Sequence, residues 1–177
     1  MRNYLIVGRP RAGKTAWTRQ AVKTLGFPLV VNDVNAEWPG QRALDASEFL
    51  DIAERRHGTP TTFVWEEATG YLAGPLVSAR DKQRTVRALV RRFHTRHVNL
   101  MLFHSLRSVP VWVMDYTDRL ILFPTNDRPQ LIQEKFKGWE PVLEAWERVN
   151  DPQREVIAVS PKGDRIVSPE DVHIFGA

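Results

Sequence analysis

The chain contains no cysteine. Disulfide bonds, thiolate metal sites and thiol nucleophiles are therefore excluded. Long hydrophobic runs are also missing, because apolar stretches such as 100–103 and 111–114 are far shorter than the about 18 residues that cross a bilayer. The first residues lack the apolar core and small-residue cleavage site of a secretory signal. We therefore expect no membrane span and a cytoplasmic location.

What is present favours one globular domain with a local excess of positive charge. The 177 residues are 42% hydrophobic and 26% charged, which suits a single core. The net charge is only +4, yet residues 79–107 hold eight Lys or Arg and one acid. If 82–97 is one helix, Arg84, Arg87 and Arg91 share a face. The apolar residues that fall opposite them are Val86, Leu89, Val90 and Phe93. This arginine stripe predicts contact with phosphate groups, and a solvated helix face is the alternative.

Apolar runs alternate with helix-compatible segments along most of the chain. The predicted strands are 4–7, 29–31, 61–65, 99–103 and 119–123. The predicted helices are 15–25, 47–56 and 82–97. Uninterrupted apolar strands in this alternation predict an α/β fold, a three-layer sandwich with a mainly parallel sheet. This core spans about 1–126 of a single domain. A helix at 140–149 and a hairpin of 155–159 with 164–167, turning at 161–163, predict a small appendage over 127–177.

One motif carries specific chemistry. Residues 8–15 match G-x-x-x-x-G-K-[ST], between a predicted strand and a predicted helix. The backbone of such a loop faces phosphates, Lys14 reaches the β and γ phosphates, and the Thr15 hydroxyl binds Mg²⁺. The predicted cofactors are therefore ATP and Mg²⁺. The predicted nucleotide-binding residues are Gly8, Arg9, Pro10, Arg11, Ala12, Gly13, Lys14, Thr15 and Ala16.

Polar residues follow two further strands. Hydrolysis needs an acid that holds Mg²⁺ through water and a base that orients the attacking water, and we assign these roles to Glu66 and Glu67. The alternative is that either glutamate is an ordinary acid at a helix start. His104, with Ser105 beside it, ends the next strand, where a polar residue can sense the γ phosphate. A buried structural histidine is the alternative there.

An arginine is the usual supplement to the charge on a transferring phosphoryl group. We rank Arg107 and Arg96 first, because both flank the strand that ends at His104, near the active edge of the sheet. The sequence alone does not select among the candidates, which are Arg91, Arg92, Arg96, Arg107 and Arg119.

The order of these features resembles the FtsK/HerA superfamily of DNA-pumping ATPases. The resemblance covers about residues 1–126 and includes segments 32–38, 66–67 and 96–110 beside the phosphate loop. With so short a chain, it is most similar to the genome-packaging ATPases of membrane-containing icosahedral viruses. Relatives often carry Gln where this chain has His104, which is a departure from the pattern.

This resemblance implies both a fold and a function. The fold would be a RecA-like sheet with an additional strand, in which the fourth strand lies between the first and third. The function would be packaging of a viral genome by ATP-driven DNA translocation, in a ring that is usually hexameric. A neighbouring subunit would supply an arginine, and capsid or portal proteins are further possible partners. DNA would contact Arg84, Arg87 and Arg91.

Two other functions share the same phosphate loop. A nucleotide or small-metabolite kinase would need an acceptor and no catalytic water base. An assembly or secretion ATPase would act on a protein or membrane partner, and DNA would not affect its turnover.

Overall fold

The computed structural model describes residues 1–33, 37–38, 45–55, 58–73, 78–151, 157–159 and 166–167. The strands are β1 (Asn3–Val7), β2 (Leu29–Asn32), β3 (Thr61–Trp65), β4 (His97–Phe103), β5 (Arg119–Leu122), β6 (Ile157–Val159) and β7 (Ile166–Val167). The helices are α1 (Lys14–Leu25), α2 (Ala46–Arg55), α3 (Ala68–Leu72), α4 (Ala79–Val90), α5 (Arg92–Thr95), α6 (Val111–Asp115), α7 (Pro129–Lys135) and α8 (Glu140–Val149). None of these helices combines the length and apolarity required to cross a bilayer.

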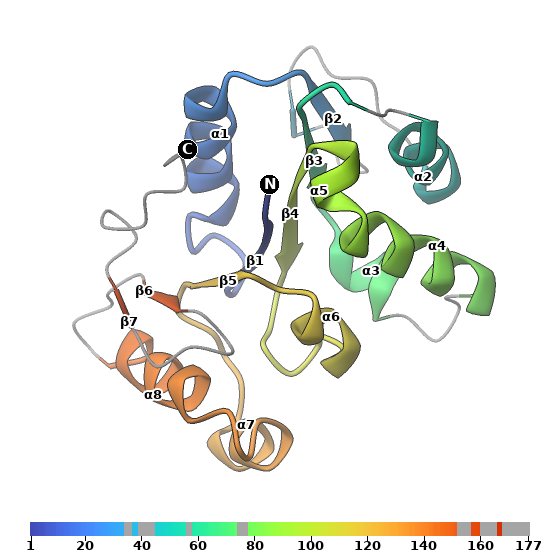
Figure 1. Ribbon diagram of the computed structural model, residues 1–177. Helices are drawn as coiled ribbons and strands as arrows, with labels where there is room; N and C mark the ends of the chain where they lie inside the picture. Colours follow the sequence, from blue (N-terminus) through green and yellow to red (C-terminus); the bar gives the residue numbers. More distant parts are fainter. Residues whose placement is uncertain are drawn as a thin grey trace.

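The strands form one sheet in the order β2-β3-β4-β1-β5-β6-β7 (Figure 1). The first five strands in this order are parallel, and β6 and β7 are antiparallel additions. Strand β4 lies between β1 and β3, as the resemblance implied, and the predicted α/β class is confirmed. All five parallel strands therefore end at one edge of the sheet, here called the carboxyl edge. The opposite edge, where they begin, is the amino edge.

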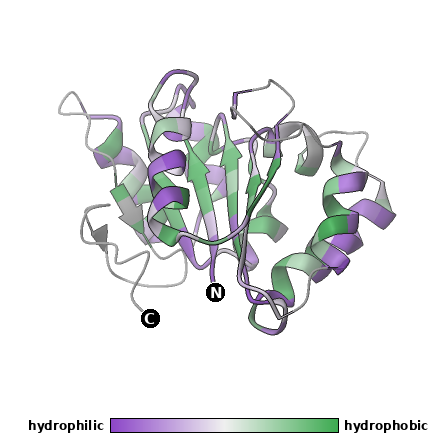
Figure 2. Cartoon of the chain, turned by 90° about the horizontal axis from the view of Figure 1, so that it is seen from above, coloured by the Kyte–Doolittle hydropathy of each residue, from purple (hydrophilic) through white to green (hydrophobic). Residues whose placement is uncertain are grey.

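Helices cover both faces of the sheet, which gives three layers (Figure 1). Successive residues of β1 point to opposite faces: Leu5 belongs to one core cluster and Ile6 to the other. Side chains of α1 pack against the Ile6 cluster, while α2, α3, α4, α6, α7 and α8 contribute to the Leu5 cluster. Figure 2 shows the apolar strands between more polar outer helix surfaces. Burial on both faces explains why the strands are uninterrupted apolar runs.

The C-terminal segment shares the core of the domain. Helix α8 has the predicted bounds, and Val142 and Trp146 lie in the Leu5 cluster. Strand β6 pairs with β5 and β7 with β6, both antiparallel. The residues predicted to turn this hairpin, 161–163, lie outside the described residues. The segment predicted as an appendage thus extends the central sheet and packs on it.

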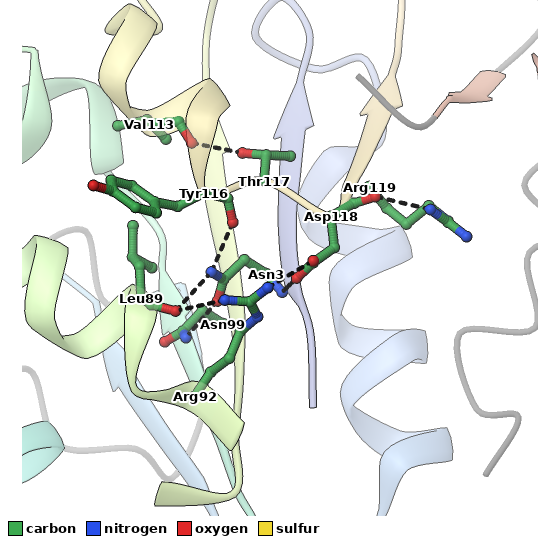
Figure 3. A network of polar contacts seen from close by, with 9 residues as sticks. All are labelled: Asn3, Leu89, Arg92, Asn99, Val113, Tyr116, Thr117, Asp118 and Arg119. Carbon is green, nitrogen blue, oxygen red and sulfur yellow. Dashed lines mark hydrogen bonds and ion pairs between the residues drawn. The ribbon is translucent and has the colours of Figure 1, made fainter. Parts of the chain in front are cut away.

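The amino edge is fastened by side chains at the starts of β1, β4 and β5 (Figure 3). The buried Asn3 amide donates to the carbonyls of Leu89 (3.1 Å) and Tyr116 (2.8 Å), and its oxygen accepts from Asn99 (2.8 Å). The Asn3 backbone N–H donates to Asp118 Oδ2 at 2.8 Å. These bonds tie α4 and the α6–β5 turn to two neighbouring strands.

An ion pair completes this amino-edge network. Arg92 donates to Asp118 Oδ1 (2.7 Å) and to the Leu89 carbonyl (3.0 Å). The Arg92 and Asp118 side chains are 14% and 28% exposed, so removal of either partner leaves a largely desolvated charge behind. The network therefore has a structural role at this edge.

The predicted helix over 82–97 is two helices. Helix α4 ends at Val90, and α5 follows after Arg91, whose φ of −79° and ψ of 2° are not helical. Of the apolar residues expected opposite the arginine stripe, Leu89 is buried, whereas Val90 and Phe93 are 47% and 63% exposed. The face that packs inward instead carries Arg84, Thr85, Ala88 and Leu89.

Candidate nucleotide site

The predicted phosphate loop occupies the carboxyl edge, between β1 and α1. The Gly8 N–H donates to the Phe103 carbonyl at 3.1 Å, and the Arg9 N–H donates to the Pro124 carbonyl at 2.8 Å. The loop is therefore held by the ends of both neighbouring strands. A Cβ on Gly8 would lie 2.5 Å from the Phe123 Cβ, so only glycine fits there.

The end of the loop has the shape that anion binding requires. Arg11 and Gly13 both have positive φ, 62° and 99°, which curls the backbone before α1 begins at Lys14. No side chain caps this 12-residue helix at Gly13. The first N–H groups of α1 have no intrahelical partner, and the helix dipole adds positive partial charge there. The predicted residues 8–16 thus form one continuous cradle at the start of a helix.

Lys14 is only 7% exposed and curls back over its own loop. Its Nζ donates to the carbonyls of Gly8 (2.8 Å) and Arg9 (3.1 Å). Burial lowers the pKa of Lys14, and the carboxylates of Glu66, Glu67 and Glu37 act against this shift. Both hydrogen-bond acceptors of the Lys14 ammonium are uncharged carbonyls. A bound phosphate would place a negative charge in direct contact with it.

Glu66 directly follows β3 and is 5% exposed. Its Oε1 accepts from the Thr15 hydroxyl at 2.7 Å, and its Oε2 accepts from the Trp38 indole at 2.7 Å. Burial raises the pKa of Glu66, while these two hydrogen bonds act in the opposite direction. The structure thus brings together the two residues predicted to hold Mg²⁺, and the indole fixes the orientation of the carboxylate.

The donor set around Thr15 suits Mg²⁺. Thr15 Oγ1, Glu66 Oε1 and, at 3.5 Å from the hydroxyl, Glu37 Oε2 are all oxygens. No group of three His, Cys, Asp or Glu side chains arranged for a metal occurs among the described residues. Mg²⁺ needs none, because it keeps several waters and is commonly bound through one or two carboxylates with substrate phosphates. These residues therefore fit the ion.

Glu67 and His104 contact one another across the ends of β3 and β4. His104 Nε2 lies 3.1 Å from Glu67 Oε2 and 3.4 Å from Oε1. Nε2 can donate to this carboxylate in the tautomer that carries a proton there. Glu67 does occupy the position before α3, as the structural alternative anticipated, but its side chain makes no capping hydrogen bond. The His104 side chain is 42% exposed, so it is not a buried core histidine.

Sheet direction separates the arginine candidates. Arg107 follows β4 and lies at the carboxyl edge. Arg96 precedes the first residue of β4, so the premise that it flanks the active edge is wrong. Seven strand residues at about 3.3 Å each place it about 20 Å from that edge. Arg96 instead takes a left-handed conformation, with φ of 59°, and donates to the Gly58 carbonyl at 3.4 Å. The remaining candidates also belong to the amino edge: Arg91, Arg92 and Arg119.

The predicted arginine stripe does not form as expected. Arg84 is 6% exposed and donates to Asp51 (2.5 Å) and to both carboxylate oxygens of Glu54 (3.2 and 3.0 Å). It joins α4 to α2 and is not available to DNA in this structure. Arg87 and Arg91 are exposed, so they alone remain from the predicted DNA contacts.

The sequence analysis assigned no role to Glu37 or Trp38, although both lie in the segment 32–38 that supported the resemblance. Trp38 is the hydrogen-bond donor to Glu66, and Glu37 approaches Thr15. Asp33 positions both, because its carboxylate accepts from the backbone N–H groups of Glu37 (2.8 Å) and Trp38 (2.7 Å). The polar residues at the end of β2 were the sequence feature that could have indicated these site residues. Residues 34–36 lie outside the described residues.

The strand order and the phosphate loop after the first strand give the chain the fold of P-loop NTPases. Similar folds occur in the genome packaging NTPase B204 from Sulfolobus turreted icosahedral virus 2 in complex with ATP-gammaS. That match has a TM-score of 0.67 and 15% identity, over 94% of this chain and 95% of the other. The DNA-packaging ATPase B204 from Sulfolobus Turreted Icosahedral Virus matches with a TM-score of 0.66 and 14% identity. This match covers 94% of this chain and 95% of the other.

A more distant structural match is the FIGL-1 AAA domain. Its TM-score is 0.51 at 13% identity, over 85% of this chain and 53% of the other. No protein-family model matches the sequence. No curated protein matches it either. At these identities the comparisons establish the fold, and the neighbours include the type of viral packaging ATPase that the sequence resembles.

Proposed function

We propose that this protein is an ATP-hydrolysing DNA translocase that packages a viral genome into a preformed capsid. The observation that supports the proposal is that two adjacent glutamates make different contacts. Glu66 contacts Thr15, whereas Glu67 contacts His104. A kinase needs the first arrangement and has no use for a water base. Solved neighbours of the same fold and size are described as genome-packaging or DNA-packaging enzymes.

In the proposed reaction, the loop N–H groups and Lys14 bind the phosphates of ATP. Thr15 and Glu66 would hold Mg²⁺, which would neutralise part of the phosphate charge when bound. Glu67 accepts a proton from the attacking water, and His104 orients the Glu67 carboxylate and senses the γ phosphate. Each role uses a contact or position already described for that residue.

The wider assembly in this proposal follows the resemblance. Subunits form a ring, hexameric in many relatives, and a neighbour contributes an arginine that stabilises the transferring phosphoryl group. Exposed Arg87 and Arg91 contact the DNA backbone. Capsid or portal proteins bind the ring at its place of action.

One variant at Glu67 and one at Lys14 test the chemistry. Glu67→Gln is expected to lower ATP turnover about 10²- to 10³-fold and to retain ATP binding, because it removes the base and keeps the side-chain shape. Lys14→Ala is expected to lose both turnover and binding. Steady-state phosphate release and equilibrium binding of ATP measure these effects, with exposed Glu134→Gln as the matched control. Near-native turnover in Glu67→Gln would contradict the assignment.

Stimulation by DNA tests the translocase function separately. We expect turnover of the purified chain to rise when double-stranded DNA is added at low ionic strength, because phosphate contacts weaken steeply with salt. Robust turnover that ignores DNA would favour an assembly or secretion ATPase, and turnover that needs a small acceptor would favour a kinase.

A further inference from the structure

A cavity of about 640 Å³ opens at the carboxyl edge beside the Glu67–His104 pair. Its walls come from four separate segments: the start of the phosphate loop, α3, the turn after β4, and the turn after β5. Thr69 and His104 lie on the side next to Glu67, where the His104 N–H donates to the Thr69 hydroxyl at 3.3 Å. The roles proposed above use Arg9, Pro10 and His104 from this lining and leave the α3 wall and the turns after β4 and β5 unassigned.

Three arginines line the cavity: Arg9, Arg107 and Arg128. Among the described residues, no carboxylate forms an ion pair with any of them. Arg9 makes a long hydrogen bond of 3.5 Å to Asn126, which is uncharged. The one acid in the lining, Asp127, accepts from the backbone N–H groups of Leu106 (2.8 Å) and Arg107 (3.4 Å). The cavity therefore has a net positive charge.

The turn that carries Arg107 is held in place from both sides. Asp127 binds its N–H groups, and Lys135 of α7 donates to the carbonyls of Arg107 and Val109. Within the turn, Ser108 donates to the Ser105 carbonyl at 2.8 Å, and its N–H donates to the Ser105 hydroxyl at 3.1 Å. Such cross-links reduce the ordering cost of binding a ligand here.

We propose that this cavity binds a phosphate group of a second ligand, beside the γ-phosphate end of ATP. The inference rests on the proposed function only in that ATP fills the neighbouring loop. Arginine guanidinium groups recognise phosphate through paired N–H donors, and the Ser105 and Ser108 side chains add neutral polar groups. The phosphate belongs either to a DNA backbone or to a free phosphorylated compound.

Binding of the second ligand at this site would be coupled to ATP hydrolysis through His104. His104 lines the cavity and also contacts Glu67. A phosphate held by Arg107 and Arg128 would therefore lie one residue away from the proposed water base. Occupancy of the cavity would change the electrostatic surroundings of that pair without any movement of the sheet.

Direct binding tests the proposal. The full-length protein is saturated with Mg²⁺ and a non-hydrolysable ATP analogue at low ionic strength. It is then titrated with a short fluorescent DNA duplex by anisotropy, and with inorganic phosphate and AMP by calorimetry. The double variant Arg107→Ala/Arg128→Ala is compared with native protein and with Arg55→Ala, which removes an exposed arginine on α2. Thermal melting of each variant confirms that it is folded.

We expect the double variant to bind one class of probe about tenfold more weakly, with Arg55→Ala within about twofold of native. Weaker duplex binding with a reduced salt dependence identifies the DNA backbone as the ligand. Loss of saturable AMP or phosphate binding with unchanged duplex binding identifies a free phosphorylated compound. Native affinity of the double variant for all three probes overturns the inference, as does the absence of any probe binding to native protein.

These outcomes are separate from failure of the proposed function. Analogue binding and ATP turnover are recorded on separate aliquots of each preparation, so a protein that does not bind or hydrolyse ATP shows this without any DNA or AMP. If Arg107 instead stabilised the transferring phosphoryl group, the double variant would show lower ATP turnover without a second ligand. Its affinity for the duplex and for AMP would then be unchanged.

Discussion

The two edges of the sheet use polar residues in opposite ways. At the amino edge, Asn3, Asn99 and Asp118 bond to one another and to backbone groups (Figure 3). At the carboxyl edge, Lys14 and Glu66 are buried, which lowers the pKa of Lys14 and raises that of Glu66. The three arginines of the cavity there have no carboxylate partner among the described residues. The first arrangement is complete without a ligand, while the second leaves charge that a polyanion can neutralise. The position of a polar residue along its strand therefore indicates whether it serves the fold or the site.

The arginines show the same contrast. Arg84 and Arg92 are 8% and 14% exposed at the side chain and are paired with carboxylates. Arg87, Arg107 and Arg128 are exposed. All of these except Arg128 belong to the basic segment 79–107, yet only the exposed arginines can contact a phosphate. A count of basic residues thus overestimates the charge available to a ligand.

The largest effect on stability should come from the amino edge. Asp118→Ala leaves the Arg92 guanidinium and the buried Asn3 N–H without their partner, and we expect a loss of about 3 kcal/mol in the free energy of unfolding. Urea unfolding measures this, with exposed Glu134→Ala as a control expected to change stability by less than about 0.5 kcal/mol. ATP turnover per folded molecule should stay native. A stable Asp118→Ala protein without turnover would reverse the roles assigned to the two edges.

The paired and exposed arginines should differ in which property they change. Arg84→Ala should destabilise the protein by about 2 kcal/mol, because it leaves Asp51 and Glu54 facing each other, and should leave DNA affinity unchanged. Arg87→Ala should alter stability by less than about 0.5 kcal/mol and weaken DNA binding. Urea unfolding and duplex anisotropy on both variants make the comparison. Weaker DNA binding in Arg84→Ala at native stability would show that the ion pair opens in solution.

The smallest effect concerns the pH dependence of stability. Because the pKa of Glu66 is raised in the folded protein, folding favours its protonated form, and that contribution is lost as pH rises through the folded pKa. Glu66→Gln does not titrate at this position. The melting temperature of Glu66→Gln relative to native protein should therefore increase from acid to neutral pH, when both are measured without ligand. A difference that shrinks over this range would mean that the hydrogen bonds from Thr15 and Trp38 outweigh burial.

Much of the fold follows from the sequence because the parallel strands are buried on both faces. The apolar run 61–65 matches β3, and the helix at 140–149 matches α8. The position of β4 between β1 and β3 came from the resemblance, since periodicity contains no information about strand order. The short helices α3, α6 and α7 were not predicted, because a helix of one or two turns leaves too few residues for a periodic pattern.

The site was predictable where one motif or one strand end defines it. Residues 8–16 form a cradle, and Glu66 and Glu67 lie where the end of β3 places them. The role of Arg84 depends on Asp51 and Glu54 of another helix, which no local pattern reveals. Arg96 was misplaced because closeness to β4 in sequence does not distinguish the two ends of the strand. The function of Trp38 depends on a contact with Glu66 that is 28 residues away.

The central position of β1 has a consequence for synthesis of the protein. Its two neighbours are β4 and β5, so Tyr4 pairs with Leu100 and Arg119. Strand β1 therefore has neither of these sheet partners until the chain has been synthesised as far as β4. Contacts of such long sequence separation slow folding and expose apolar strands meanwhile. A nascent chain that stops before β5 should thus have the whole phosphate-loop sequence and still lack the ability to bind nucleotide.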